Sequence, residues 1–188
     1  MNRIPKIEKP EASQTVAALY DAVEKKLGII PNMIKAMGNS RAILQAYLDL
    51  SSAMSRGILS PKTREKIALL VAEENTCNYC LSAHSAIGSQ MKIPQSEIES
   101  ARRGESEDVR EQAILVLTKH ILKTRGNVAD HVYADAIAAG VTNEEAAEVI
   151  GHVATNLLTN YFNRFAQTEI DFPRVQALSE SAVCSCAH

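Results

Sequence analysis

Residues 60–84 read SPKTREKIALLVAEENTCNYCLSAH, and this stretch decides how the chain folds. Ser60-Pro61 predicts a helix start, because serine caps free backbone amides and proline fits the first helical position. The helix continues to about Glu74, where Asn75-Thr76 predicts a break with Thr76 as a new N-cap. A second helix is then expected from Cys77 to about Gln90. The two together predict a helical hairpin.

The same helical pattern extends outward in both directions from this hairpin. Apolar residues recur at three- and four-residue spacing, and glycine, proline or a capping residue separates one run from the next. Only residues 128–133 mildly favour a strand. The sequence therefore predicts an all-α fold. The expected helices are 13–27, 31–38, 40–56, 60–74, 77–90, 95–104, 106–122, 130–139 and 142–166.

The length of 188 residues and the 46% of hydrophobic residues predict one well-packed domain. We assign residues 1–172 to this helical domain. Residues 173–188 lack convincing periodicity and are expected to form a flexible tail. That tail contains Cys184 and Cys186, which are either incidental thiols or a mobile electron relay to a buried disulfide.

Charge and composition exclude several classes of partner. The formal net charge is −2, no basic stripe is present and the chain has no Trp, so no nucleic-acid partner is expected. No apolar run approaches the roughly 20 residues of a membrane span, and the N-terminus lacks a signal-peptide pattern. We therefore expect a soluble, cytoplasmic protein without membrane partners. In a reducing compartment, a few clustered cysteines indicate metal binding or redox chemistry.

Cys77, Cys80 and His84 carry the chemical signal of the hairpin. Residues three and four apart share one face of a helix, so these three side chains line up. The free amides and the dipole at a helix N-terminus favour a thiolate there. Such a thiolate attacks a peroxide oxygen or a disulfide sulfur. The spacing also predicts that Cys77 and Cys80 form an intramolecular disulfide on mild oxidation.

Glu65 joins this group only if the chain bends. Twelve residues separate it from Cys77, which is about 18 Å on one continuous helix. Reflection about a bend near residue 75 instead brings position 65 opposite position 85, so that Glu65 faces His84. This predicts a proton relay from Glu65 through His84 to the cysteine pair.

Three other interpretations of these residues remain open at this point. A CxxC pair in a helical protein is often incidental, because cysteine is a small hydrophobe that is readily buried. Cys77, Cys80 and His84, with Glu65, also present a donor set that suits zinc. Finally, the pair is compatible with a redox-responsive binding protein that has no catalytic turnover.

The ordered spacing of these residues resembles a known signature. The spacing is similar to the motif of the alkylhydroperoxidase D family. Eleven residues separate Glu65 from Cys77, two separate Cys77 from Cys80, and three separate Cys80 from His84. That family belongs to the carboxymuconolactone decarboxylase superfamily. The resemblance covers roughly residues 27–171, including the Gly28-Ile29-Ile30-Pro31-Asn32 segment and the helix around residues 156–165.

This resemblance implies an all-helical alkylhydroperoxidase D-like bundle with the CxxC at the start of a helix, and homo-oligomers. It implies a thiol-dependent peroxidase that needs no cofactor or metal. Cys80 would form the sulfenic acid and Cys77 would act as proton donor and resolving thiol, with Glu65 and His84 as the proton relay. The partners would be a hydroperoxide and an unidentified dithiol electron donor. Family members often have histidine where this chain has Tyr79.

Overall fold

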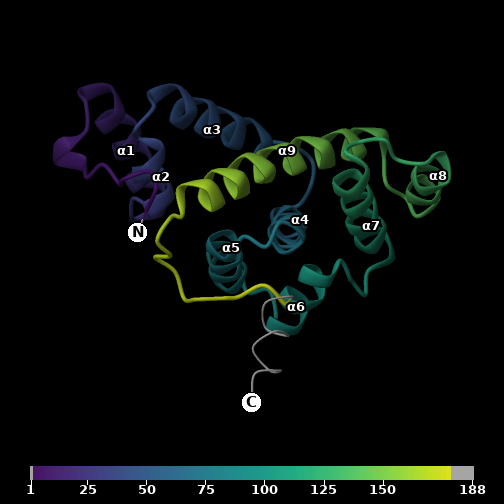
Figure 1. Ribbon diagram of the computed structural model, residues 1–188. Coiled ribbons are helices and arrows are strands. Elements are labelled where there is room, and N and C mark those ends of the chain that lie inside the picture. Colours follow the sequence, from purple (N-terminus) through teal and green to yellow (C-terminus); the bar gives the residue numbers. More distant parts are fainter. Residues whose placement is uncertain (1, 179–188) are drawn as a thin grey trace, which may run out of the picture.

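The computed structural model describes residues 2–178, and within them every regular element is a helix (Figure 1). This confirms the all-α prediction. The elements are a 3₁₀ turn η1 (Lys9–Glu11), α1 (Gln14–Leu27), α2 (Asn32–Met37), α3 (Arg41–Met54), α4 (Pro61–Glu74), α5 (Asn78–Gln90), α6 (Gln95–Arg103), α7 (Val109–Thr124), α8 (Asp130–Ala138) and α9 (Asn143–Ala166).

Helix α4 is the centre of the bundle. It contacts α5, α6, α7 and α9, and Figure 1 shows these helices arranged around it. Residues 66–72 are all buried, so this helix has no solvent-facing stripe over almost two turns. A helix that is buried all round is a core helix, which explains why its apolar residues run consecutively rather than on one face.

Local sequence sets most helix starts at or within one residue of the expected positions. The hydroxyls of Ser13, Ser60 and Thr142 each accept a backbone N–H from the first turn of the helix that follows. Helix α7 differs, since it begins at Val109 instead of near residue 106. The Asp108 carboxylate accepts the Glu111 N–H at 2.7 Å and so sets this start.

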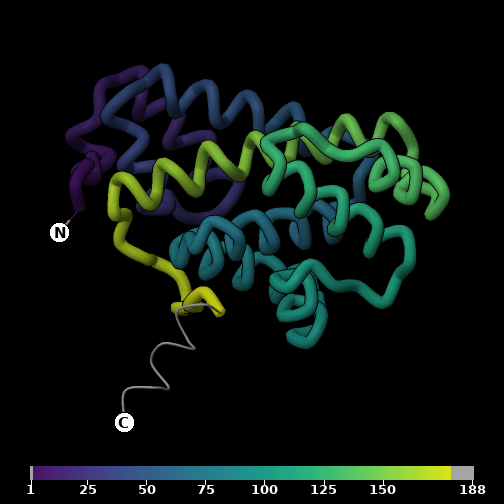
Figure 2. The backbone as a smooth tube through the Cα atoms, turned by 45° about the vertical axis from the view of Figure 1, so that its right-hand side comes forward, coloured from purple at the N-terminus to yellow at the C-terminus, as the bar shows by residue number. Residues whose placement is uncertain are grey.

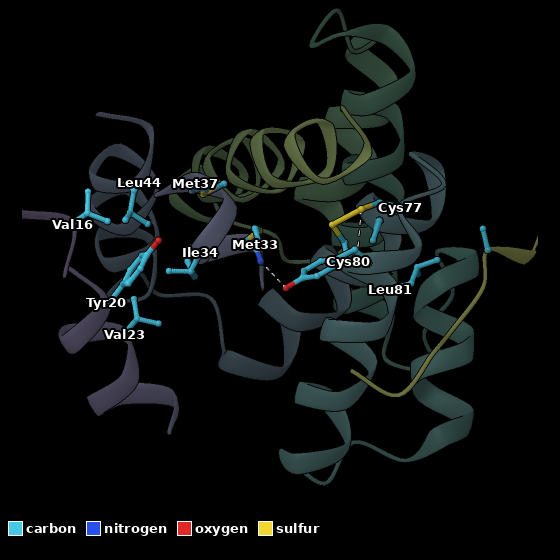
Figure 3. Packing of buried hydrophobic residues seen from close by; sticks show 13 residues of the cluster. Val16, Tyr20, Val23, Met33, Ile34, Met37, Leu44, Cys77, Cys80 and Leu81 are labelled. Carbon is cyan, nitrogen blue, oxygen red and sulfur yellow. Dashed lines mark hydrogen bonds between the residues drawn. A yellow bond between two sulfur atoms is a disulfide. The ribbon is translucent and has the colours of Figure 1, made fainter. Parts of the chain in front are cut away.

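Buried apolar residues form two main clusters on either side of α4. The first joins α1, α2 and α3 to α5, with Tyr20, Met37 and Leu81 fully buried (Figure 3). The second joins α4 to α7, α8 and α9 through residues such as Ile67 and Leu115. The start of α5, with its two cysteines, belongs to the first cluster.

A buried lysine, Lys66, joins α4 to α6 and α7 by ion pairs. The Lys66 ammonium donates to Glu111 at 2.6 Å and to Glu97 at 2.7 Å. Burial lowers the pKa of Lys66, but the hydrogen bonds and charges of the two carboxylates outweigh it and raise the pKa overall. The lysine stays charged, and its two partners satisfy a group that is otherwise costly to bury.

The ordered chain continues beyond residue 172, the expected end of the domain. Figure 2 shows the last described segment, in yellow, running on from α9. The amide of Val175 donates to Ser82 at 2.9 Å, the Arg102 guanidinium donates to the Gln176 carbonyl at 2.7 Å, and Ala177 is fully buried. The packed domain therefore reaches Leu178. The expectations for Cys184 and Cys186 lie outside the described residues.

Among residues 2–178, no helix is both long and apolar enough to cross a membrane.

Candidate active site

The turn between α4 and α5 places the cysteine pair at a helix start. Thr76 has φ 52°, in the left-handed region, and the Cys77 N–H donates back to the Ala72 carbonyl at 2.9 Å. This reversal makes Cys77, rather than Thr76, the N-cap of α5. The shift by one residue follows from the left-handed turn, since that conformation leaves Thr76 unable to cap the next helix.

Cys77 and Cys80 are joined in a disulfide, with their Cα atoms 5.3 Å apart. Cys77 Sγ also accepts the Cys80 N–H at 3.4 Å, as a capping side chain does (Figure 3). Both residues are almost completely buried, at 1% and 3% exposure. The pair therefore sits in the first turn of a helix and inside the protein, where the helix amides favour negative charge on sulfur.

Glu65 and His84 meet across the hairpin. Glu65 Oε1 lies 2.6 Å from His84 Nδ1, which is the contact that the reflection about residue 75 predicts. Burial lowers the pKa of His84, but the charge of the Glu65 carboxylate and its hydrogen bond outweigh burial and raise the pKa overall. The carboxylate thus orients the ring and leaves Nε2 free of this contact.

A cavity of about 450 Å³ opens beside these residues. Cys80, His84 and Glu65 line it, whereas Cys77 is absent from its wall. Its walls come from α1 to α5, from α9 and from the segments after α1 and α9, and many of the lining side chains are apolar. A volume of this size is typical of a site for a small organic ligand. A ligand in the cavity therefore contacts Cys80 and not Cys77.

Asn163 is a site residue that sequence reasoning missed. Its side-chain amide donates to Cys80 Sγ at 3.4 Å and to Met33 Sδ at 3.1 Å. It is 3% exposed, and its Oδ1 atom has no hydrogen-bond partner among the described residues. An amide N–H aimed at a sulfur atom stabilises negative charge there.

A signal for Asn163 was present in the sequence. The buried face of α9 carries polar residues at helical spacing where apolar ones are normal, namely His152, Asn156, Thr159, Asn160 and Asn163. All of these except Asn160 line the cavity. A run of buried polar groups on one helix face is costly unless it serves bonding or function, so this pattern indicates a site wall.

Tyr79, which lies between the two cysteines in the sequence, lines the cavity. Its hydroxyl accepts the Met33 N–H at 3.1 Å, and its ring packs edge-on against Phe172 with centroids 5.8 Å apart. Burial raises the pKa of Tyr79. The neutral phenol therefore anchors α2 against α5, and it does not supply a titrating group near neutral pH.

Within residues 2–178, no three His, Cys, Asp or Glu side chains are arranged to hold a metal ion. Cys77 and Cys80 bond to each other, and Cys80 and His84 line the same cavity. The site described by these residues is a dithiol–disulfide couple with an adjacent carboxylate–imidazole pair. Such a couple carries two electrons, and the imidazole carries a proton.

Comparison with known proteins gives a match to one family over part of the chain and several proteins with a similar fold. Residues 41–118 match the model of the carboxymuconolactone decarboxylase family. A peroxidase-related protein with an alkylhydroperoxidase core from Ralstonia eutropha JMP134 has the same fold, with a TM-score of 0.81 at 21% identity over 90% of this chain and 92% of that one. A peroxidase-related protein from Silicibacter sp. TM1040 has a TM-score of 0.78 at 20% identity, covering 89% of each chain.

Two further similarities extend the comparison. The debrominase Bmp8, in a Cys-to-Ala form complexed with 2,3,4-tribromopyrrole, has a TM-score of 0.76 at 16% identity over 100% of this chain and 98% of its own. An uncharacterized protein from Haemophilus influenzae is 50% identical over 44 residues, which is 23% of this chain and 39% of that relative. The chain therefore contains a segment, residues 41–118, that matches the carboxymuconolactone decarboxylase family, and it shares its fold with alkylhydroperoxidase-like and peroxidase-related proteins.

Proposed function

We propose that this protein is a thiol-dependent peroxidase that reduces hydroperoxides through Cys80 and Cys77. The observation that carries the proposal is the asymmetry of the pair. Cys80 lines the cavity together with His84 and Glu65, whereas Cys77 is absent from the cavity wall and bonds to Cys80. A substrate in the cavity meets the Cys80 sulfur first. Cys77 is positioned to resolve whatever forms there.

In the first step, the Cys80 thiolate attacks the outer peroxide oxygen. The O–O bond breaks, Cys80 becomes a sulfenic acid, and the leaving alkoxide takes a proton and departs as an alcohol. His84 is the proton carrier for this step, since Glu65 holds it in place and keeps its pKa raised. Asn163 stabilises the attacking thiolate through its side-chain amide.

In the second step, the Cys77 thiol attacks the Cys80 sulfenic acid. The S–S bond forms and the sulfenic oxygen leaves as water. Two electrons have then moved from the cysteine pair to the peroxide. A dithiol donor reduces the disulfide and closes the cycle, so the proposed setting is the reducing cytoplasm.

Steady-state consumption of cumene hydroperoxide with dithiothreitol as the dithiol tests this function. The Cys80→Ser variant is expected to lose turnover. Cys77→Ser is expected to retain one equivalent of reaction and to leave a sulfenic acid that dimedone traps. The matched control is Cys184→Ser with Cys186→Ser, which removes the other two cysteines and is expected to keep turnover.

Two results would contradict the proposal. The reverse pattern for Cys77 and Cys80 would exchange their roles. A wild-type protein that forms the disulfide with peroxide but shows no repeated turnover would instead support a redox-responsive protein without catalysis.

A debrominase is a second candidate, because the likeness to Bmp8 extends over the whole chain. In that reaction the two thiols become the disulfide, the carbon–bromine bond becomes carbon–hydrogen, and bromide leaves. The same dithiol couple beside a partly apolar cavity provides both electrons. Bromide release from a bromopyrrole with dithiothreitol, without peroxide consumption, would favour this candidate.

We also propose that the chain assembles into a homo-oligomer. Large apolar side chains lie exposed on α9, with Ile150, Tyr161 and Phe165 each more than half accessible. Their spacing of eleven and four residues places them on one stripe of the helix. A stripe of this kind is a natural surface for self-association.

A further inference from the structure

Arg64 stands at the rim of the cavity as a cation without an acidic partner. Its guanidinium donates to the Ser55 carbonyl at 2.7 Å, and the side chain lines the cavity between α3 and α9. Among residues 2–178, no carboxylate lies within ion-pair distance of it. The neighbouring Glu148 carboxylate is held by the amides of Ile58 and Leu59 at 2.7 and 3.0 Å. The guanidinium therefore keeps most of its donors available.

His152 completes a polar corner beside Arg64. It is 7% exposed and lines the cavity, and its Nε2 atom has no hydrogen-bond partner among the described residues. Burial and the charge of Arg64 lower the pKa of His152, against a smaller opposing effect of Glu148. The ring is neutral near pH 7, so one ring nitrogen carries a hydrogen. A buried polar side chain that lines a cavity and has an atom without a partner indicates a ligand group.

The corner is well separated from Cys80. His152 and Asn163 both lie on α9, eleven residues apart, which corresponds to about 16 Å along the helix. Asn163 contacts Cys80 Sγ, so His152 marks the other end of the same cavity wall. Between them α9 contributes the polar side chains of Asn156 and Thr159, and other helices add apolar side chains such as Leu48, Ala68 and Ile87 to the lining. A ligand that fills the cavity thus meets a redox sulfur, a partly apolar wall and a cationic corner.

We propose that Arg64 and His152 form a carboxylate-binding subsite. The guanidinium donates two hydrogen bonds to the carboxylate oxygens, and His152 Nε2–H donates a third. The ligand that fits has an acid group at one end and an apolar body. The identity of the substrate rests on the proposed peroxidase function. With that function, the substrate is a hydroperoxide of an apolar carboxylic acid, bound with the peroxide near Cys80.

Calorimetric binding of decanoate and of 1-decanol to the oxidised wild-type protein tests the subsite without any turnover. Decanoate is expected to bind at least about 10-fold more tightly than the alcohol, because hydrogen bonds to a charged group are strong. Arg64→Gln is expected to weaken decanoate binding by roughly 10- to 100-fold. His152→Leu is expected to weaken it less, and Arg64→Lys is expected to retain much of the affinity through its charge.

Lys26→Gln is the matched control. Lys26 is also a cation on the cavity lining, but it is exposed on α1, and its loss is expected to change decanoate affinity by less than about 2-fold. Equal binding of decanoate and decanol to the wild type, no binding of decanoate, or equal losses in Arg64→Gln and Lys26→Gln would overturn the subsite. Retained binding in Arg64→Lys shows that loss in Arg64→Gln does not come from misfolding.

Turnover of a hydroperoxy fatty acid and of its methyl ester tests the substrate class separately. The ratio of kcat/KM for the acid over the ester is expected to fall about 10-fold or more in Arg64→Gln. An unchanged ratio would overturn the substrate class. If the wild type reduces neither compound while decanoate still binds through Arg64, the peroxidase function fails and the subsite stands.

Discussion

At the residue scale, the Glu65–His84 contact decides the protonation behaviour of the site. The carboxylate raises the pKa of His84 above its usual value despite burial. A raised pKa in the folded state contributes stability that is fully present below the unfolded value of about 6.5. That contribution is lost as the pH rises through the folded-state pKa. The Glu65–His84 pair should therefore stabilise the fold most in mildly acidic solution.

The Glu65→Gln variant tests this dependence. Its loss of unfolding free energy relative to wild type is expected to be larger at about pH 5.5 than at about pH 9. Urea unfolding at both pH values measures this loss. The matched control is Glu73→Gln, which breaks the buried pair of Glu73 with Arg102 at 2.8 Å. Arginine does not titrate between these pH values, so the loss of unfolding free energy in Glu73→Gln should not show the pH dependence that an imidazole causes. A pH-independent loss in Glu65→Gln would contradict the expectation.

At the scale of the element, helix α9 supplies the polar wall of the cavity and brings Asn163 to the sulfur of Cys80. Asn163→Asp keeps the shape of the side chain but places a carboxylate beside that sulfur. Repulsion between two anions disfavours the thiolate, so alkylation of Cys80 by iodoacetamide at neutral pH in the reduced protein is expected to slow by roughly 10-fold. Mass spectrometry of the labelled peptide measures the rate.

Asn156→Asp is the control on the same helix face. It introduces the same charge about 10 Å further along α9. Its effect on the alkylation rate is expected to be clearly smaller, because the interaction weakens with distance. Equal slowing in both variants would mean that Asn163 acts through the general field of the cavity and not through its contact with Cys80.

At the scale of the whole molecule, the exposed apolar stripe of α9 predicts self-association. Light scattering at micromolar concentration is expected to give a mass that is a multiple of the 20.5 kDa chain. Ile150→Lys with Tyr161→Lys is expected to shift the protein towards the monomer, because two charges on the stripe are costly to bury. Val109→Lys, at a 73% exposed apolar position on α7, is the matched control. A monomeric wild-type protein would contradict this prediction.

Short-range chemistry explains why so much of this protein follows from its sequence alone. Ser60-Pro61 starts α4, and the break near residue 75 folds α5 back against it. The contact between Glu65 and His84 is a consequence of that hairpin, because its arms have fixed helical spacing. The all-α fold and the cysteine pair at a helix start therefore need only local propensities and capping.

The cavity and the residues on its far side depend on tertiary structure. Asn163 lies 83 residues from Cys80, and His152 and Arg64 meet only because α9 packs across α4. Local pattern shows that α9 has polar residues on one face, but not what that face meets. Likewise, the segment up to Leu178 has no periodicity, and it is ordered by hydrogen bonds to α4, α5 and α6. Sequence thus determined the hairpin, while long-range packing decided which side chains surround its sulfur atoms, because burial depends on contacts that no local pattern encodes.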